Sequence, residues 1–376
     1  MKVVIAIDSL KGSLTSMEAG YAIKEGIIRG KPEAQVVVKP LADGGEGTTE
    51  ALVEGLSGER IDITVTGPLK KPVSAYYGYL KESNTAIIEM AQASGIMLLT
   101  EQEKAPYHTT SYGVGEMIKD AILRGCRNFI IGIGGSATND GGIGMLKALG
   151  VQFKDKDGND VGDGGQALEK VHFIDCTNLL KELADCHFRV ACDVNNPLCG
   201  QNGATYIYGP QKGVTAEEKE KLDQDMKNYA LVTAQTIGVN HQETPGAGAA
   251  GGLGFAFLSY LGAELVSGVS LILQAINLGE ELRDADIVIT GEGCLDYQTA
   301  MGKAPMGVAR LAKEVNENIR VIAFAGSVTE DASACNEAVD AFFPIIRGIT
   351  TLEEAMEPQN AKENMIATVE QVFRLL

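Results

Sequence analysis

Short apolar runs rich in β-branched residues recur near both ends of the chain, and most of them stop at Gly, Asp or Ser. They are VVIAID (3–8), AQVVVKPLAD (34–43), ADIVITGEG (285–293), IRVIAFAGS (319–327) and AFFPII (341–346). Apolar positions at helical spacing lie between them, as in 16–30 and 304–318. Alternating strands and helices predict a parallel sheet covered on both faces, with ligands at the carboxyl ends of its strands. Five such strands indicate a small flavodoxin-like domain.

Residues from about 45 to 280 have a different pattern. Residues 60–80 alternate as a β-hairpin does, and 215–237 have the spacing of a charged amphipathic helix. A chain of 376 residues also exceeds what one hydrophobic core usually fills. We therefore predict an α/β fold of two domains. Residues 1–45 and 281–376 form the flavodoxin-like parallel-sheet domain, and a larger α/β domain, 46–280, is inserted into it.

Charge restricts the class of ligand. The chain has 32 Lys and Arg against 50 Asp and Glu, a net charge of -18. Binding to nucleic acid or to an anionic membrane needs a basic surface, so both are disfavoured as partners. Any anionic ligand must therefore meet a local group of positive side chains.

The N-terminus and the cysteines bear on location. MKVVIAIDSLKG reads as a strand rather than a signal peptide, because Asp8 comes early and no small-residue cleavage site follows. No apolar stretch is long enough to span a membrane. Seven cysteines form no C-x-x-C pair, and four histidines are scattered. We expect a cytoplasmic protein with reduced cysteines and no structural zinc.

Two stretches are rich in glycine. GIGGSATNDGGIG (132–144) lies between a strand-like run and a helical pattern, an arrangement that can place backbone N–H groups around an anion. PGAGAAGGLGFAF (245–257) leads into an apolar helix. Each can instead be a tight turn or a site of close packing. Neither is a P-loop or a good dinucleotide fingerprint, which argues against a Rossmann NAD site.

Acidic residues follow several strands. Asp8 and Ser9 end the first one, with Lys11 in the next turn, and Asp43 precedes two glycines. If the flavodoxin-like order holds, Asp43 lies beside Asp8. Asp193 follows another apolar run and can act as a base or a magnesium ligand. Helix capping and solvated turns are the alternatives.

Two further loops carry lysines. Lys212 lies in GPQKG (209–213), a flexible turn suited to a movable phosphate contact. Residues 289–309 contain Glu292, Asp296 and Lys303 close to glycines. An acid, a hydroxyl and a lysine in one loop favour a magnesium-assisted phosphoryl site.

Together these motifs resemble the bacterial glycerate kinases of the first type. DSLKGSLTS, PLADGGEGT, GIGGSATNDGG, CDVNNPLCG, GPQKG, PGAGAAGGLG and TGEGCLDYQTAMGKAPMGVA occur in the family's order, from residue 1 to about 330. Leu10 and Leu41 depart from it, since Phe and Met are commoner there. The resemblance implies ATP- and Mg²⁺-dependent phosphorylation of D-glycerate, with the 2-hydroxyl favoured over the 3-hydroxyl and 2-phosphoglycerate as the product.

The resemblance, carried over residue by residue, yields a hypothesis for the site. The catalytic set is Asp193, Asp296 and Lys11, and both aspartates are also assigned to the metal. The substrate set is Asp8, Ser9, Asp43, Gly44, Ser136, Asn139 and Lys303. The nucleotide set is Gly134, Gly135, Lys212, Gly248, Gly251, Gly252 and Glu292. Phosphoryl transfer needs these parts because it depends on positioning and charge neutralisation.

Two alternative functions and the oligomeric state stay open at this point. A kinase for another small hydroxy acid would need the same parts. A non-catalytic two-domain solute-binding protein would also enclose a small ligand, although it would need export. The oligomeric state is not encoded in composition, and a homodimer is the assembly we consider.

Overall fold

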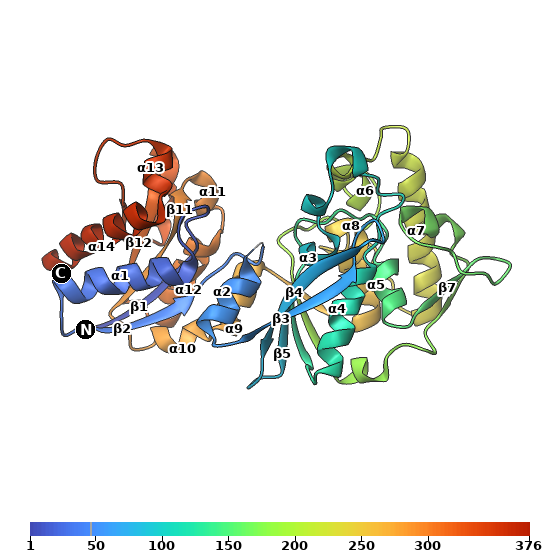
Figure 1. The fold of residues 1–376 in the computed structure, drawn as a ribbon, viewed down its shortest axis with the longest axis horizontal. Coiled ribbons are helices and arrows are strands. Elements are labelled where there is room, and N and C mark those ends of the chain that lie inside the picture. Colours follow the sequence, from blue (N-terminus) through green and yellow to red (C-terminus); the bar gives the residue numbers. More distant parts are fainter. Residues whose placement is uncertain (46) are drawn as a thin grey trace. The chain divides into compact units, whose positions relative to one another are not determined.

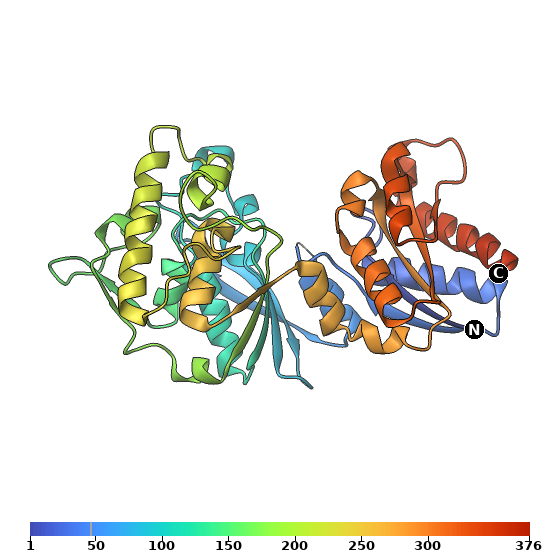
Figure 2. The same ribbon diagram turned by 180° about the vertical axis from the view of Figure 1, so that it is seen from behind.

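The computed structural model describes residues 1–45 and 47–376, which form two compact units (Figures 1 and 2). The terminal unit consists of Met1–Asp43, Glu50–Ser57 and Val269–Leu376. The central unit consists of Gly44–Thr49 and Gly58–Gly268. Each unit is built around its own sheet.

The predicted boundaries at 45/46 and 280/281 differ from this division. Residues 269–280 pack with the terminal unit, where Val269 and Leu273 lie against Gly307. Leu52 in the segment 50–57 is fully buried as well. The sequence boundaries followed a change in residue pattern, whereas the structural ones follow packing.

The terminal unit contains a five-stranded parallel sheet in the order β13-β12-β11-β1-β2. Its strands are β1 (Lys2–Ile7), β2 (Gln35–Pro40), β11 (Ile287–Leu295), β12 (Arg320–Val328) and β13 (Ala341–Pro344). Counted along this unit, the order is 2-1-3-4-5, which is that of flavodoxin. All five strands predicted from the sequence are present, within a few residues of their expected ends.

Helices cover both faces of this sheet. They are α1 (Ser16–Gly30), most of α2 (Thr48–Gly55), α9 (Gly268–Ala275), α10 (Leu278–Leu282), α11 (Tyr297–Ala300), α12 (Ala304–Val315), α13 (Leu352–Met356) and α14 (Pro358–Leu375). Figures 1 and 2 show α1 and α14 on one face and α12 on the other. Thr15 begins α1 through a capping box with Glu18.

The central unit contains a six-stranded sheet in the order β10-β9-β6-β5-β4-β3. Its strands are β3 (Glu59–Thr66), β4 (Pro72–Leu80), β5 (Thr85–Glu89), β6 (Asn128–Gly132), β9 (His187–Ala191) and β10 (Glu264–Val266). β3 and β4 form the predicted hairpin, and the other four strands run parallel. A separate pair joins β7 (Gln152–Lys154) to β8 (Phe173–Asp175).

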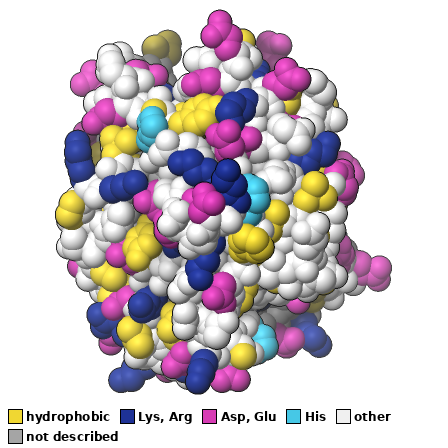
Figure 3. Space-filling model, turned by 90° about the vertical axis from the view of Figure 1, so that its right-hand side faces the viewer, with side chains coloured by type: hydrophobic (Ala, Val, Ile, Leu, Met, Phe, Trp, Pro, Cys, Tyr) yellow, Lys and Arg dark blue, Asp and Glu magenta, His cyan; other side chains and the backbone are white. Residues whose placement is uncertain are grey.

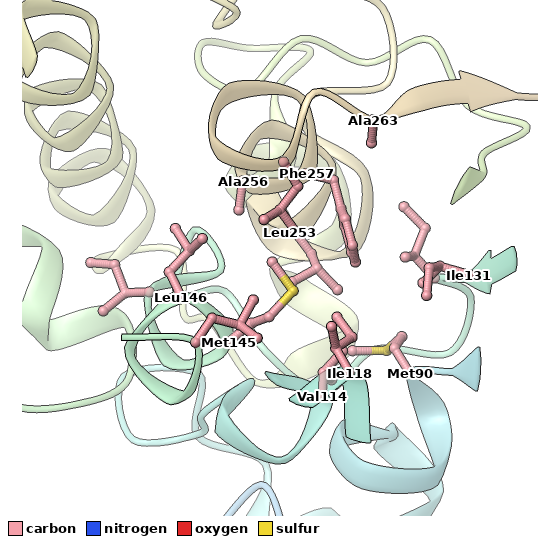
Figure 4. Close-up of a cluster of buried hydrophobic side chains, with 14 of the residues drawn as sticks. Met90, Val114, Ile118, Ile131, Met145, Leu146, Leu253, Ala256, Phe257 and Ala263 are labelled. Atoms are coloured by element: carbon pink, nitrogen blue, oxygen red, sulfur yellow. The ribbon is translucent and has the colours of Figure 1, made fainter. Parts of the chain in front are cut away.

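The core of the central unit is formed where its helices pack on this sheet. Its helices are α3 (Ala91–Ser94), α4 (Tyr112–Leu123), α5 (Ile143–Ala148), α6 (Ala204–Tyr208), α7 (Lys219–Ile237) and α8 (Ala249–Leu261), with a 3₁₀ turn η5 at Pro210–Lys212. Figure 4 shows Leu253 and Phe257 of α8 gathered with Ile131 of β6 and Ile118 of α4. Parallel sheets covered by helices confirm the predicted α/β class.

Candidate functional site

Charged side chains gather at the carboxyl edge of the terminal sheet. Asp8 follows β1, Asp43 follows β2, and Glu292 lies near the end of β11. β1 is hydrogen-bonded to both other strands, and the Asp8 amide donates to the Gly291 carbonyl at 3.0 Å. In a sheet of this order, the edge between β1 and β11 is the topological switch point, where ligands usually bind. The neighbourhood expected for Asp8 and Asp43 is therefore present.

Asp8 is the most buried acid of this edge, with 9% of its surface exposed. Burial raises the pKa of its carboxyl to about 7, with the charges of Asp43 and Glu292 adding to the effect. The Ser9 amide, which donates to Asp8 Oδ1 at 2.6 Å, and Lys11 act in the opposite sense. A carboxyl that titrates near neutral pH can take up or release a proton during a reaction.

Lys11 and Asp43 form a loose pair beside Asp8. Their Nζ and Oδ2 atoms are 4.0 Å apart, and the two side chains are 75% and 42% exposed. An exposed pair at this distance contributes little to stability. Both side chains are therefore accessible to a ligand at little energetic cost.

Glu292, Asp296, Thr299 and Lys303 form one hydrogen-bonded network. Asp296 begins the short helix α11 by accepting from the Thr299 amide at 2.9 Å. The Thr299 hydroxyl donates to Glu292 Oε1 at 2.6 Å. Lys303 Nζ lies 3.3 Å from Asp296 Oδ1 and 3.8 Å from Glu292 Oε2. The polar stretch singled out in the sequence is thus one connected group.

The two acids of this network differ in pKa. Burial raises the pKa of Glu292, against the Thr299 hydroxyl and Lys303. Burial also acts to raise the pKa of Asp296, but the Thr299 amide and Lys303 outweigh it and hold that pKa below its usual value. Asp296 is therefore the acid of the pair that stays ionised most readily, as a metal ligand must.

The first glycine-rich stretch presents open backbone at the carboxyl edge of the central sheet. Gly134 and Gly135 follow β6 and are exposed. A Cβ at Gly134 would meet nothing within 4 Å, and one at Gly135 would lie 3.6 Å from Ala91. Within the described residues, the amides of Gly134, Gly135 and Ser136 donate no hydrogen bond. These two glycines are accessible to a ligand.

The helix start behind this loop is occupied by the protein itself. α5 has only six residues, and the buried Asp140 carboxylate accepts from the amides of Gly142 and Gly144 at 3.1 and 3.3 Å. It also accepts from the Ser111 amide and hydroxyl, both at 2.9 Å. The expected anion site at the helix start is therefore wrong. Asp140 was not among the predicted site residues, although it stands directly before the glycine pair that opens the helix.

Lys212 is placed differently from the prediction. Its side chain is 2% exposed, and Nζ donates to Ser136 Oγ at 2.6 Å and to the Thr138 carbonyl at 2.7 Å. Burial lowers the pKa of Lys212 to about 7, while the charge of Asp140 acts in the opposite sense. The expectation of a movable lysine in a flexible turn is wrong, because Lys212 is in η5 and its ammonium is hydrogen-bonded beneath the loop. Whether it contacts a ligand stays untested.

The glycines of the second stretch are used for packing. A Cβ at Gly251 would collide with the Thr138 carbonyl, and one at Gly252 would lie 2.8 Å from Gly141. A Cβ at Gly248 would collide with the Pro197 carbonyl. Both Gly251 and Gly252 also have positive φ, at 67° and 90°. Their part in nucleotide binding stays a prediction. Because Gly251 and Gly252 have no side chain, they can pack closely against the first glycine-rich stretch.

Two acids at the central edge hold the segments where the chain passes between units. Asp193, which follows β9, accepts from the Gly268 amide at 3.0 Å. Glu89, at the end of β5 and 4% exposed, accepts from the Thr49 amide at 2.7 Å. A Cβ at Gly44 would lie 2.6 Å from Gly268, so this position requires glycine. Glu89 was missed, although it ends an apolar run as Asp193 does.

Ser136 and Asn139 have different surroundings. Ser136 is 8% exposed and accepts from Lys212. Asn139 is fully buried and donates to Thr205 Oγ1 at 3.0 Å, while its Oδ1 has no partner among the described residues. The buried position of Asn139 gives it a clear structural role, and its contact with substrate stays a prediction.

The predicted site residues thus fall into two sets. The terminal unit contains Asp8, Ser9, Lys11, Asp43, Glu292, Asp296 and Lys303. The central unit contains Gly44, Gly134, Gly135, Ser136, Asn139, Asp193, Lys212, Gly248, Gly251 and Gly252. In the part of the chain that the structure describes, no three His, Cys, Asp or Glu side chains form a ready-made metal cluster.

On the face of the central unit in Figure 3, acidic, basic and hydrophobic side chains are interspersed without a large area of one kind. Among the described helices, none has the length and apolar character needed to cross a bilayer.

Comparison with known proteins adds an independent finding. The chain matches the glycerate kinase family over residues 3–376. It is 46% identical over 375 residues to the glycerate 2-kinase of Escherichia coli (strain K12), which covers 98% of each chain. It is 45% identical over 373 residues to the glycerate kinase of Bacillus subtilis (strain 168), covering 99% of this chain and 97% of the relative. A crystal structure described as glycerate kinase 2 from Salmonella typhimurium LT2 is 46% identical and has a TM-score of 0.92, covering 100% of this chain and 98% of the other.

Proposed function

The chain belongs to the glycerate kinase family and is a phosphotransferase, and on this premise we propose that it transfers the γ-phosphoryl group of ATP, with Mg²⁺, to the 2-hydroxyl of D-glycerate. The name of the relative in Escherichia coli, a glycerate 2-kinase, supports the choice of hydroxyl. The product would be 2-phosphoglycerate. A non-catalytic solute-binding protein is no longer a candidate, because the family is one of enzymes.

The observation that carries this proposal is the group of acids and lysines at the switch point of the terminal sheet. Lys11 and Lys303 are cations able to pair with the glycerate carboxylate or with phosphate oxygens. Asp8, Asp43 and Glu292 add carboxylates able to accept from glycerate hydroxyls. A protein of net charge -18 meets the need for local positive groups here.

The residues present fit a magnesium ion. Mg²⁺ prefers oxygen ligands and is usually held by one or two carboxylates together with waters and substrate phosphates, so the lack of a three-acid cluster among the described residues is no obstacle. Asp296 is the carboxylate of the terminal unit that we assign to it, and Asp193, in the central unit, stays a candidate ligand from the sequence alone. When bound, Mg²⁺ would neutralise charge on the phosphates.

The nucleotide phosphates are assigned to Gly134 and Gly135. Among the described residues their amides have no hydrogen-bond acceptor, and their outer faces are open. Successive free amides at a glycine turn suit phosphate oxygens. Glu292 in the terminal unit and Lys212, Gly248, Gly251 and Gly252 in the central unit stay in the nucleotide set only as predictions from the sequence.

Asp193 is our candidate for the group that orients the reacting hydroxyl and accepts its proton. Its side chain is exposed at the end of β9, and the Gly268 amide restrains one of its oxygens. Carboxylates in this position contribute about 10²- to 10⁴-fold to proton transfer. Asp8, with a pKa raised to about 7, is the second acid able to exchange a proton near neutral pH.

The test is incubation of the protein with ATP, Mg²⁺ and D-glycerate, followed by ³¹P and ¹³C NMR of the product. We expect the proton-coupled phosphorus resonance to be a doublet, split by the single proton on C2. A triplet, split by the two protons on C3, would overturn the regiochemistry alone. L-glycerate and glycolate serve as matched acceptors, and a preference for either over D-glycerate would favour a kinase of another small hydroxy acid.

Two wider expectations remain proposals. The seven cysteines are free thiols, which supports a reducing, cytoplasmic location. A homodimer is our working assembly, and sedimentation of the purified protein would test it.

A further inference from the structure

A buried lysine without an acidic partner lies beneath the open glycine loop. Lys212 is 2% exposed, and within the described residues no carboxylate forms an ion pair with its ammonium. Its two acceptors, Ser136 Oγ and the Thr138 carbonyl, are both neutral and both belong to the loop after β6. An ammonium buried in this way is costly unless a negative charge comes close.

The loop above Lys212 is held in place on its inner side only. The Ala137 amide donates to the Ser94 carbonyl at 2.9 Å, and the Ile96 amide donates to the Gly135 carbonyl at 2.8 Å. The Thr109 hydroxyl donates to the Ala137 carbonyl at 2.9 Å. These bonds hold the Gly135 and Ala137 carbonyls and the Ala137 amide on the inner side, and among the described residues the amides of Gly134, Gly135 and Ser136 are left without a partner.

The outer side of the loop offers hydrogen-bond donors at consecutive residues. The amides of Gly134, Gly135 and Ser136 make no hydrogen bond with described residues, and Gly135 has a φ of 69°. Ser136 Oγ accepts from Lys212, so its own O–H proton is free to donate elsewhere. Donors arranged around a turn of this kind bind oxyanions.

We propose that Lys212 is a positioning residue that acts through Ser136, holding the hydroxyl of Ser136 and the amides of Gly134, Gly135 and Ser136 around one phosphate group of the nucleotide. This inference rests on the proposed function for the identity of the ligand. Lys212 does not touch the phosphate. It polarises the Ser136 hydroxyl and places a positive charge behind the loop.

Charge gives this arrangement a measurable signature. Burial lowers the pKa of Lys212 to about 7 against the charge of Asp140, a carboxylate that four donors already satisfy. Lys104, whose backbone packs on Gly213, has its ammonium paired with Glu101. A phosphate above the loop stabilises the protonated form of Lys212. At pH 8, nucleotide binding is therefore accompanied by uptake of a proton onto Lys212 Nζ.

The experiment is titration calorimetry of the full chain with ADP at pH 8, in two buffers of different ionisation enthalpy. Lys212→Met should raise the Kd for ADP about tenfold and abolish proton uptake. Lys147→Met is the matched control, because Lys147 is also largely buried in the central unit but pairs with Asp160 and Asp163 away from the loop. It should bind ADP with the affinity and proton uptake of the unaltered protein.

Ser136 provides a second arm that does not depend on the folding of Lys212→Met. Ser136→Ala should weaken ADP binding several-fold, and Ser136→Thr, which keeps the hydroxyl, should restore it. Folded Lys212→Met or Ser136→Ala proteins that bind ADP with unaltered affinity and proton uptake would overturn the proposal. Variants that lose affinity for 2-phosphoglycerate while retaining that for ADP would also overturn it, since the loop would then hold the phosphorylated product.

The outcome separates this inference from the proposed function. ADP binding is measured without glycerate, so a protein that fails to phosphorylate glycerate but loses ADP affinity in Lys212→Met refutes only the choice of acceptor. A protein that phosphorylates glycerate and is unaffected by Lys212→Met refutes only the role of Lys212.

Discussion

The carboxyl edges of the two sheets use different groups to prepare a ligand site. At the terminal edge, charged side chains such as Asp8, Lys11 and Asp296 stand at strand ends. At the central edge, backbone amides at the exposed Gly134 and Gly135 take the place of charged side chains, and a buried lysine, Lys212, lies beneath them. Ionisable side chains suit metal binding and proton transfer. Backbone amides held in one position suit the binding of phosphate oxygens.

The two edges also differ in how easily a ligand can move the groups that would bind it. Lys11 and Asp43 are 4.0 Å apart and exposed, so they can turn toward a ligand. The loop at Gly134 is fastened by inward hydrogen bonds and by the second glycine stretch packed behind it. Preorganised donors cost no rearrangement when a ligand binds. Five substitutions test this contrast.

The largest effect is expected at Asp193, the acid that stands among the amides of the central edge. Asp193→Asn should lower kcat roughly 10³-fold, because an amide cannot accept the hydroxyl proton. The amide oxygen can still accept from Gly268, so the thermal midpoint should stay unchanged. Steady-state kinetics with D-glycerate measure the first effect and calorimetry the second. Near-normal turnover would confine proton transfer to the terminal edge.

The pH dependence of the free energy of unfolding tests whether Asp8, at the terminal edge, is a buried acid that titrates near neutral pH. The native protein keeps the Asp8 proton up to about pH 7, whereas the unfolded chain loses it near pH 4. The native state therefore binds more protons in this window, and the free energy of unfolding falls as pH rises from 4 to 7. The shift corresponds to about 4 kcal/mol as an order of magnitude.

Asp8→Asn should remove this fall and make the protein more stable than the original at pH 8. Urea unfolding between pH 4 and pH 8 measures it. Lys11→Ala is the comparison variant, because it leaves Asp8 buried and removes a charge that lowers the Asp8 pKa, so the fall should persist and extend to slightly higher pH. An unchanged pH slope in Asp8→Asn would mean that the carboxyl is hydrated and not a buried acid.

A pair of glycine substitutions separates supporting glycines from open ones. Gly251→Ala should lower the free energy of unfolding by more than about 2 kcal/mol, because φ is 67° and the new Cβ meets the Thr138 carbonyl. Gly134→Ala should change stability by less than about 0.5 kcal/mol, since the space is open, yet raise the KM for ATP. Equal stability losses in both variants would erase the distinction between the two stretches.

The smallest effect is expected at Lys303. Lys303→Ala should raise the KM for an anionic substrate about tenfold with little change in thermal midpoint, because its ion pairs with Asp296 and Glu292 are partly exposed. Initial rates with varied ATP and varied glycerate identify which substrate is affected. Unchanged constants for both would leave Lys303 a role only in holding Asp296.

Local pattern was enough for much of the fold. Period and strand-end residues predicted α1 at 16–30 and all five strands of the terminal sheet, because parallel strands are apolar throughout and end at polar turns. The motif resemblance to glycerate kinases is confirmed by the family match over residues 3–376. The strand order was only a conditional expectation, because β2 and β11 are joined through the central unit and not by a short connection.

Less of the candidate site could be predicted from the sequence. Neither Glu89 nor Asp140 stood out in the sequence. Their importance depends on hydrogen bonds from the amides of Thr49 and Gly142, respectively. Lys212 looked like a surface lysine, since a turn of Gly, Pro and Gln carries no sign of burial. Hydrogen-bond partners distant in sequence are invisible to a local pattern.

The sequence by itself determined the α/β class, the strand ends that carry acids, and the family, since each depends on residues near one another along the chain. Tertiary structure alone decided which glycines face outward and which fill a gap. It also decided that Lys212 supports the loop from below and that Asp140 occupies the helix start. The physical reason is that burial, and with it the pKa of an acid or a lysine, is set by segments that meet only when the chain folds.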